Sequence, residues 1–177
     1  MTFLKQFFSS PNQPAMKEIV YRGGVVTFRI PAHWREEYSD IEGGMFYEDH
    51  SASGTLRLTI ITMTTPKQAQ SRSALDVLQV VENGLKNDGV QGTTTSRKDG
   101  NAVFKYVEAA SERGRRLTIF YWVVANPLPP RHARGATFSY TVLAEQRSQP
   151  RVQRELEMLE TEIEAATFSP EIGVVSE

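Results

Sequence analysis

Alternating apolar and polar positions predict that much of this chain forms β-strands. In residues 54–63, apolar side chains recur at every second position, which is the period of a strand with one buried face. The runs 18–22 and 25–30 are similarly rich in strand-forming residues, and two glycines lie between them. Because glycine readily adopts the positive φ of tight turns, we expect a hairpin here and a second hairpin between 43–49 and 54–63.

The second half of the chain predicts four more strands. They are expected at about 92–98, 102–111, 116–125 and 136–144. Glycines in the short connections between the first three of these strands favour hairpin turns. Residues 117–125 are apolar on both faces, which is typical of a central strand whose sheet is covered on both sides. The last strand alternates more strictly, so one of its faces should be wetter.

A helix is predicted over residues 73–88, where apolar side chains recur at helical spacing. Ser73 is placed to cap the N-terminus of this helix, and Asp76 is placed to interact favourably with the helix dipole. Gly89 suits the left-handed conformation that follows the last turn of many helices. The sequence therefore indicates both ends of the helix as well as its buried side.

A second helix is expected near the end of the chain, with Ser148 as its N-cap and Pro150 in its first turn. Its apolar residues form one seam: Val152, Leu156, Leu159, Ile163 and Ala166. Its glutamates fall mostly off this seam and are expected in water: Glu155, Glu157, Glu160, Glu162 and Glu164. Because the seam is short for a coiled coil, we expect the helix to pack on the sheet.

Residues 1–16 predict a short N-terminal helix or arm. Four apolar side chains form a stripe at helical spacing: Phe3, Leu4, Phe7 and Phe8. Such a helix is marginal alone, so the stripe should dock on its own domain or contact a second copy or another partner. Lys5 and Gln6 interrupt the stretch, which therefore lacks the unbroken apolar core of a secretory signal. No later segment approaches the roughly 20 apolar residues of a membrane span, and no membrane role is expected.

The order of strands, helix, strands and helix predicts an α+β domain, with a broad antiparallel sheet and helices packed on both faces. A single domain over 17–169 suits a chain of 177 residues, and 170–177 is expected to be a flexible tail. The chain has no cysteine, which excludes disulfides, thiolate metal ligands and cysteine nucleophiles and fits the reducing cytoplasm. The formal net charge of -1 gives no overall field that favours nucleic acid.

Few residues have the pattern of a catalytic or metal site. Glu48, Asp49 and His50 are adjacent, but neighbouring side chains of a strand point to opposite faces and do not converge on one ion without a turn. The sequence has neither a G-x-S-x-G nucleophile turn nor a glycine-rich phosphate loop. A Ser–His–Asp triad that assembles only in space stays open. We expect no catalytic residue, no metal and no cofactor.

Residues 126–135, with the sequence NPLPPRHARG, predict a long proline-rich connection between two strands. Its prolines favour an extended polyproline conformation, and it carries Arg131, His132 and Arg134. These three side chains are candidates for a partner-binding loop or for the lip of a groove, because binding residues are often on loops. The alternative is an ordinary wide hairpin loop whose charges keep it soluble.

Trp34 is the other candidate binding residue. Pro31 cannot donate to a strand ladder, so the strand before it should end there and the chain should turn. Trp34 follows three residues later, where its large side chain can fold back over the edge of the sheet and close the core. Alternatively, it forms the aromatic wall of a ligand groove, with His33 beside it.

These features together resemble the PsbP-like superfamily, through a hairpin ending in F-x-I-P-x-x-W, a Gly-Gly strand, the strand LRLTI, a helix, hairpin strands and a final amphipathic helix. The resemblance spans about 17–169 and rests on a few positions: Phe28, Ile30, Pro31, Trp34, Gly43 and Gly44. It implies an α+β sandwich with a broad antiparallel sheet. It also implies action by binding other proteins, and some small bacterial members are adaptor chaperones for type VI secretion effectors.

Two classes of function fit this sequence. The first is a non-catalytic bacterial protein-binding module in the cytoplasm, an adaptor or chaperone with a protein partner, which could also form a homodimer. The alternative is a small-molecule binding or hydrolytic domain with a groove near Trp34 and His132. A purely structural subunit that associates with itself is a third interpretation.

Overall fold

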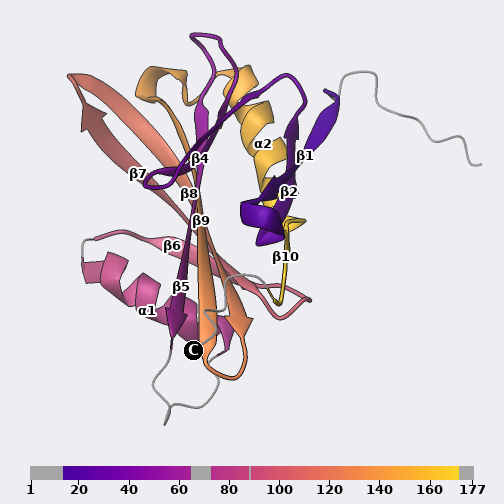
Figure 1. Ribbon diagram of the computed structural model, residues 1–177. Coiled ribbons are helices and arrows are strands. Elements are labelled where there is room, and N and C mark those ends of the chain that lie inside the picture. Colours follow the sequence, from indigo (N-terminus) through magenta and orange to yellow (C-terminus); the bar gives the residue numbers. More distant parts are fainter. Residues whose placement is uncertain (1–13, 65–72, 88, 172–177) are drawn as a thin grey trace, which may run out of the picture.

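The computed structural model describes residues 14–64, 73–87 and 89–171, and these form two antiparallel sheets and two α-helices (Figure 1). The larger sheet has the spatial order β3-β4-β5-β9-β8-β7-β6 and contains β3 (Arg35–Ser39), β4 (Gly43–Tyr47), β5 (Thr55–Thr64), β6 (Gly92–Ser96), β7 (Ala102–Glu112), β8 (Arg115–Leu128) and β9 (His132–Leu143). The smaller sheet has the order β1-β2-β10 and contains β1 (Met16–Tyr21), β2 (Val26–Pro31) and β10 (Thr167–Phe168). The helices are α1 (Ala74–Asn87) and α2 (Pro150–Glu164). The predicted α+β class, with a mostly antiparallel sheet and two helices, is confirmed.

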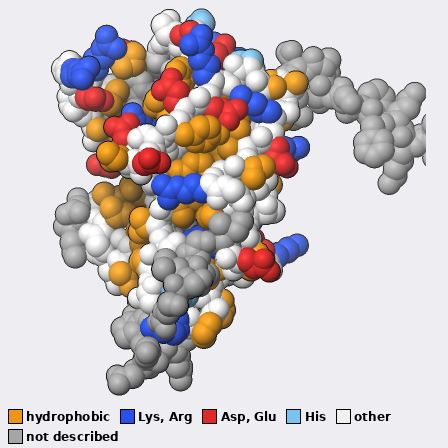
Figure 2. Space-filling model, in the orientation of Figure 1, with side chains coloured by type: hydrophobic (Ala, Val, Ile, Leu, Met, Phe, Trp, Pro, Cys, Tyr) orange, Lys and Arg blue, Asp and Glu red, His pale blue; other side chains and the backbone are white. Residues whose placement is uncertain are grey.

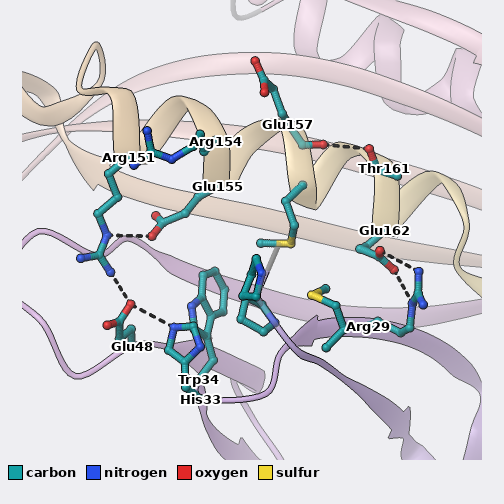
Figure 3. Close-up of a pocket in the computed structure, with 14 residues that line it drawn as sticks. Arg29, His33, Trp34, Glu48, Arg151, Arg154, Glu155, Glu157, Thr161 and Glu162 are labelled. Atoms are coloured by element: carbon teal, nitrogen blue, oxygen red, sulfur yellow. Dashed lines mark hydrogen bonds and ion pairs between the residues drawn. The ribbon is translucent and has the colours of Figure 1, made fainter. Parts of the chain in front are cut away.

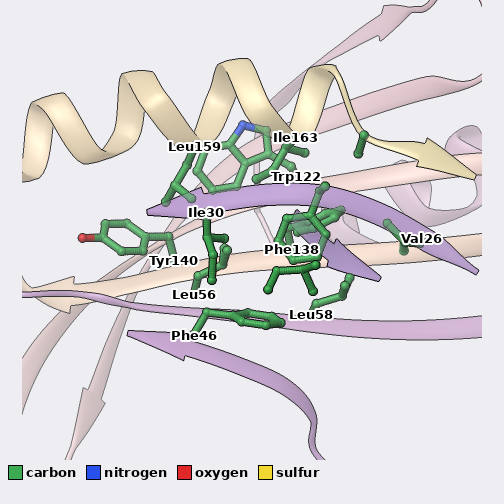
Figure 4. Packing of buried hydrophobic residues seen from close by; sticks show 14 of the residues in the cluster. Val26, Ile30, Phe46, Leu56, Leu58, Trp122, Phe138, Tyr140, Leu159 and Ile163 are labelled. Carbon is green, nitrogen blue, oxygen red and sulfur yellow. The ribbon is translucent and has the colours of Figure 1, made fainter. Parts of the chain in front are cut away.

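The large sheet has a hydrophobic cluster on each face, because the apolar side chains of β8 point alternately to both sides. Val123 and Ala125 pack in the cluster that contains Leu78 of α1. Trp122 and Val124 belong to the cluster on the other face, which includes residues of the small sheet and of α2 (Figure 4). Strand β8 lies between β9 and β7, so it is an interior strand of the sheet, as its apolar side chains on both faces predicted.

The predicted turns and helix ends follow from local conformational preferences. Strands β1 and β2 form the expected hairpin, and Gly23 and Gly24 take positive φ values of 66° and 95° in its turn. At the start of α1, the Asp76 N–H donates to Ser73 Oγ at 3.2 Å and the Ser73 N–H donates to Asp76 Oδ2 at 2.9 Å. This reciprocal pair is a capping box. After the helix, Gly89 has a φ of 78°, as its proposed C-terminal role requires.

The prediction of a long loop over residues 126–135 is wrong. Strand β8 continues to Leu128, β9 begins at His132, and the two strands pair up to this point. Proline is tolerated here because β7 pairs with β8 no further than Ala125, so Pro127 lies on a local edge where its missing N–H is not needed. Only a short turn, which contains a cis bond between Pro129 and Pro130, joins the two strands.

Short or polar elements were the other source of error. Strand β3 was not predicted, because its five side chains are exposed and mostly charged or polar, and β10 has only two residues. Ser148 does not cap α2, because the N-cap position is Gln149, which makes no side-chain capping hydrogen bond. The apolar seam of α2 is confirmed by the burial of Val152, Leu159 and Ile163.

Some predictions fall on residues that are not described. The N-terminal helix or arm lies almost wholly before Pro14, and Met16 already belongs to β1. Residues 172–177 of the expected tail are likewise outside the described part, and the domain limits of 17 and 169 stay a prediction. Neither helix of the described residues has both the length and the apolar character needed to cross a bilayer.

Candidate functional site

A cleft of about 610 Å³ lies between α2 and the end of the β1–β2 hairpin, and we call it the α2 cleft (Figure 3). Its apolar lining comes from Met16 and Pro31 on the strands, from Trp34 just after them, and from Met158 on α2. Pro31 ends β2, so the chain turns there and places Trp34 beside the helix. Helix α2 is amphipathic, and Met158 stands next to its buried seam.

Paired charges frame this apolar surface at both ends (Figure 3). At one end, Arg29 of β2 makes two hydrogen bonds to Glu162 of α2, with Nε–Oε2 and Nη2–Oε1 distances of 2.8 and 2.9 Å. At the other end, Arg151 contacts Glu48 and donates from Nε to Glu155 Oε1 at 3.0 Å. A two-point Arg–carboxylate contact, as between Arg29 and Glu162, is directional. This contact and the Arg151–Glu48 pair tie the two ends of α2 to the rest of the fold.

A buried polar chain connects the cleft to the core. Trp34 is only 2% exposed and stacks on Tyr140 of β9, with ring centroids 6.4 Å apart and ring planes 10° from parallel. The Tyr140 hydroxyl donates to Glu155 and accepts the Gly54 N–H at 3.1 Å. Burial and, after it, the hydrogen bond to Glu155 raise the pKa of Tyr140 well above its ordinary range. The phenol therefore stays neutral and acts as a fixed donor.

The arrangement is suited to binding, and most polar side chains that line the cleft already have partners within the chain. His33 Nε2 lies 3.3 Å from Glu48 Oε2, and the Thr161 hydroxyl donates to the backbone carbonyl of Glu157. Across residues 14–64, 73–87 and 89–171, no group of three or more histidines and carboxylates is placed to hold a metal ion. Figure 2 shows acidic and basic side chains interspersed on the face in view, without a large area of one sign.

The structure separates the candidate residues of the sequence. Trp34 lines the α2 cleft and also closes the core, so both interpretations of this residue describe part of its environment. His132 begins β9, eight residues before Tyr140, on which Trp34 stacks. At about 3.3 Å per residue, His132 is therefore roughly 26 Å along the strand from the cleft. The predicted groove shared by Trp34 and His132 is wrong.

The structure places the two arginines of the predicted loop in different surroundings. Arg134 is completely buried in β9, where its guanidinium donates to the Ser169 carbonyl at 2.6 Å and to Asn126 Oδ1 at 3.3 Å. Arg131 is half-buried in the turn, and His132 Nδ1 lies 3.2 Å from Thr64 Oγ1 of β5. These contacts tie the end of the β8–β9 hairpin to its neighbours.

Two glutamates that were expected in water are part of the site. Glu162 is 7% exposed because it pairs with Arg29, and the Glu155 side chain is largely covered between Tyr140 and Arg151. They are seven residues apart, which puts them on the same side of α2 beside its apolar seam. That spacing was the available signal, and nothing in the sequence of β2 marked Arg29 as its partner.

No family model matches the sequence, and no curated protein matches it significantly. Solved structures do match its fold. LpqN of Mycobacterium tuberculosis, described as involved in cell envelope biogenesis, is 17% identical with a TM-score of 0.57, and the match covers 92% of this chain and 88% of LpqN. A Bacteroides thetaiotaomicron protein is 16% identical with a TM-score of 0.56, and the match covers 88% of this chain and 49% of that protein.

The PsbP protein of the cyanobacterium Synechocystis also matches, with 11% identity and a TM-score of 0.41 over 90% of this chain and 96% of that protein. LpqN and the Bacteroides protein have PsbP/DcrB-like folds, so the PsbP-like fold expected from the sequence is confirmed. At such low identity the likeness shows the fold alone.

Proposed function

We propose that this chain is a non-catalytic protein-binding module whose α2 cleft holds an extended segment of a partner protein. The observation that carries this proposal is the apolar surface of Met16, Pro31 and Met158 between two ends of paired charge. An apolar side chain can enter this space without breaking an ion pair, so its burial is opposed by little polar desolvation.

The lining favours a protein segment over a small polar metabolite. Metabolite sites hold a few polar groups that converge on the ligand and fix its orientation. Here Arg29 pairs with Glu162 at one end of the cleft, and Arg151 pairs with Glu48 and Glu155 at the other. Methionine side chains are flexible and polarisable, and they are common on surfaces that accept varied apolar partners. The partner segment should therefore carry large apolar residues, with charged residues beside them that can meet the rim.

An adaptor or chaperone role extends this proposal. The resemblance to PsbP-like adaptors supports it, since such proteins bind a client segment and deliver it without changing it. In this extension the chain acts in the cytoplasm on a client such as a secretion effector. The fold neighbour LpqN is described as involved in cell envelope biogenesis, which is a different role for a similar fold.

Selection from a phage-displayed library of random peptides tests the binding site directly. We expect enriched peptides that share large apolar residues and bind the native chain. Met158→Glu should weaken their binding at least tenfold, about 1.4 kcal/mol, because it places a charge in the apolar part of the cleft. Met63→Glu is the matched control, since Met63 is an exposed methionine on β5 outside the cleft.

An unfolding curve for each variant shows that a loss of binding is not a loss of fold. Peptides that bind Met158→Glu and the native chain equally well would place the binding surface elsewhere. If selection enriches no peptide above a column without protein, the proposed function is wrong.

A further inference from the structure

The described chain begins at the α2 cleft. Pro14 is the first described residue and belongs to the lining, and Met16 lines the cleft two residues later. Thirteen residues precede Pro14, and their covalent connection therefore leaves directly from the cleft. Whatever else these residues do, their local concentration at the cleft is high.

The sequence of this segment has the chemistry that the cleft accepts. Its apolar side chains are Phe3, Leu4, Phe7 and Phe8. A volume of about 610 Å³ is within the roughly 300–1,000 Å³ of pockets that hold drug-sized ligands, so it can take large aromatic groups. The described lining has four carboxylates and three guanidinium groups, while residues 1–13 carry Lys5 and no acidic residue. The opposite net charges of the lining and of residues 1–13 therefore slightly favour contact between them.

The intervening residues are long enough for the contact. Five residues lie between Phe8 and Pro14, so six residue steps give a reach of about 20 Å in an extended chain. The charged ends of the cleft are marked on α2 by Arg151 and Glu162, which are about 16 Å apart at 1.5 Å per helical residue. The aromatic side chains can thus reach any part of the apolar lining between these ends.

We propose that the apolar side chains of residues 3–8 occupy the α2 cleft of their own chain and compete there with a partner segment. This inference rests on the proposed function for its premise that the cleft binds apolar segments. A short covalent connection gives an effective concentration in the millimolar range, so even a contact with a millimolar dissociation constant is substantially formed. The competition then weakens partner binding about two- to tenfold, by the fraction of clefts left open.

Paramagnetic relaxation tests the contact in the full chain. The chain has no cysteine, so Thr2→Cys gives a single position for a nitroxide label. The methyl groups of Met16 and Met158 report on the cleft, and the methyl group of Met63 on β5 is an internal reference. A tether alone brings the label near the cleft, so the matched control carries the same label together with Phe7→Ser and Phe8→Ser.

We expect the relaxation enhancement at Met158 to be at least twofold greater in the native sequence than in this control, with no difference at Met63. Equal enhancement in the two labelled chains overturns the proposal. A sample that mixes nitroxide-labelled chains with isotope-labelled chains tests binding to a second copy, and enhancement that persists at Met158 in this mixture also overturns the contact within one chain.

A peptide from the library selection separates this inference from the proposed function. If the inference holds, the peptide should bind the chain with Phe7→Ser and Phe8→Ser two- to tenfold more tightly than the native chain. If the peptide binds both chains with equal affinity, the cleft binds proteins but its own N-terminal segment does not occupy it. A selection that fails altogether contradicts the proposed function, whatever the relaxation measurement shows.

Discussion

Tyr140→Phe isolates the polar chain behind the cleft from the packing around it. The ring stays, so the stack on Trp34 and the packing of the core are retained, and only the hydroxyl is lost. That hydroxyl donates to the Glu155 carboxylate and accepts the N–H of Gly54, which is itself buried. The substitution therefore removes one hydrogen bond to a charged group and leaves one buried donor without its partner.

The expected loss of stability follows from these two contacts. A hydrogen bond to a charged group contributes about 1.5–3 kcal/mol, and a buried unsatisfied donor costs about 1–3 kcal/mol. The two effects share one oxygen and are not additive, so we expect a loss of about 2–4 kcal/mol. With a urea m-value of about 2 kcal/mol/M, the midpoint of unfolding should fall by about 1–2 M.

Equilibrium urea unfolding, followed by the fluorescence of the two buried tryptophans, measures this loss. Tyr106→Phe is the control, because Tyr106 is a half-buried tyrosine of β7 that is not part of the cleft, and its change should stay within about 0.5 kcal/mol. A loss for Tyr140→Phe no larger than that of the control would refute the role given to its hydroxyl. In a double-mutant cycle, Tyr140→Phe and Glu155→Gln should be coupled by at least about 1 kcal/mol.

The stability of the native chain and that of Tyr140→Phe should depend differently on pH. Burial and the bond to Glu155 raise the pKa of Tyr140 in the folded chain above its ordinary value of 10.0. Above about pH 10 the unfolded tyrosine loses its proton while the folded one keeps it, so stability falls as pH rises, by up to about 1.4 kcal/mol per pH unit. Tyr140→Phe lacks this group, and the stability difference between the two proteins should shrink from pH 10 upward. A difference that stays constant to pH 11 contradicts the raised pKa.

Two glycine substitutions make a matched pair with opposite signs. Gly54→Ala should destabilise the fold by about 1–3 kcal/mol, since its Cβ would lie 2.3 Å from Tyr140 Cζ and force the ring out of place. Gly84→Ala should stabilise it by about 0.5–1 kcal/mol, because Gly84 is inside α1, an added Cβ there meets no atom within 4 Å, and alanine is the better helix former. Thermal unfolding of both variants checks the pair, and a stable Gly54→Ala or a destabilised Gly84→Ala would show that the local packing is misjudged.

The sequence was informative at most positions where local conformation decides the structure, although the cap predicted at Ser148 was wrong. The turn of the first hairpin needs positive φ, which Gly23 and Gly24 supply, and Ser73 and Gly89 mark the ends of α1 for similar reasons. Such signals lie within a few neighbouring residues, so they can be recognised without the tertiary structure. The strict alternation of β9 was equally readable, because its even-numbered side chains from Ala136 to Val142 are the buried ones.

The sequence misled where tertiary context overrides local preference. Proline normally indicates a break in a strand, and this indication holds at Pro31, which ends β2. It fails at Pro127, because β7 ends its pairing before this point and leaves one side of β8 without a partner strand. Where the pairing of a neighbouring strand ends is a property of the assembled sheet, and the conformational preferences of single residues do not predict it. The burial of Arg134 was missed for the same reason.

The cleft itself shows how far a pattern on one helix can be taken. Glu155, Met158 and Glu162 are spaced by three and four residues, so they lie along one side of α2. The first glutamate is bonded to Tyr140 of the large sheet, and the last is bonded to Arg29 of the small sheet. These two contacts fix the helix to both sheets, and the half-buried methionine between them lines the α2 cleft. A partner that enters beside Met158 leaves both contacts intact, which is why the fold can keep an apolar cleft open without weakening its own attachments.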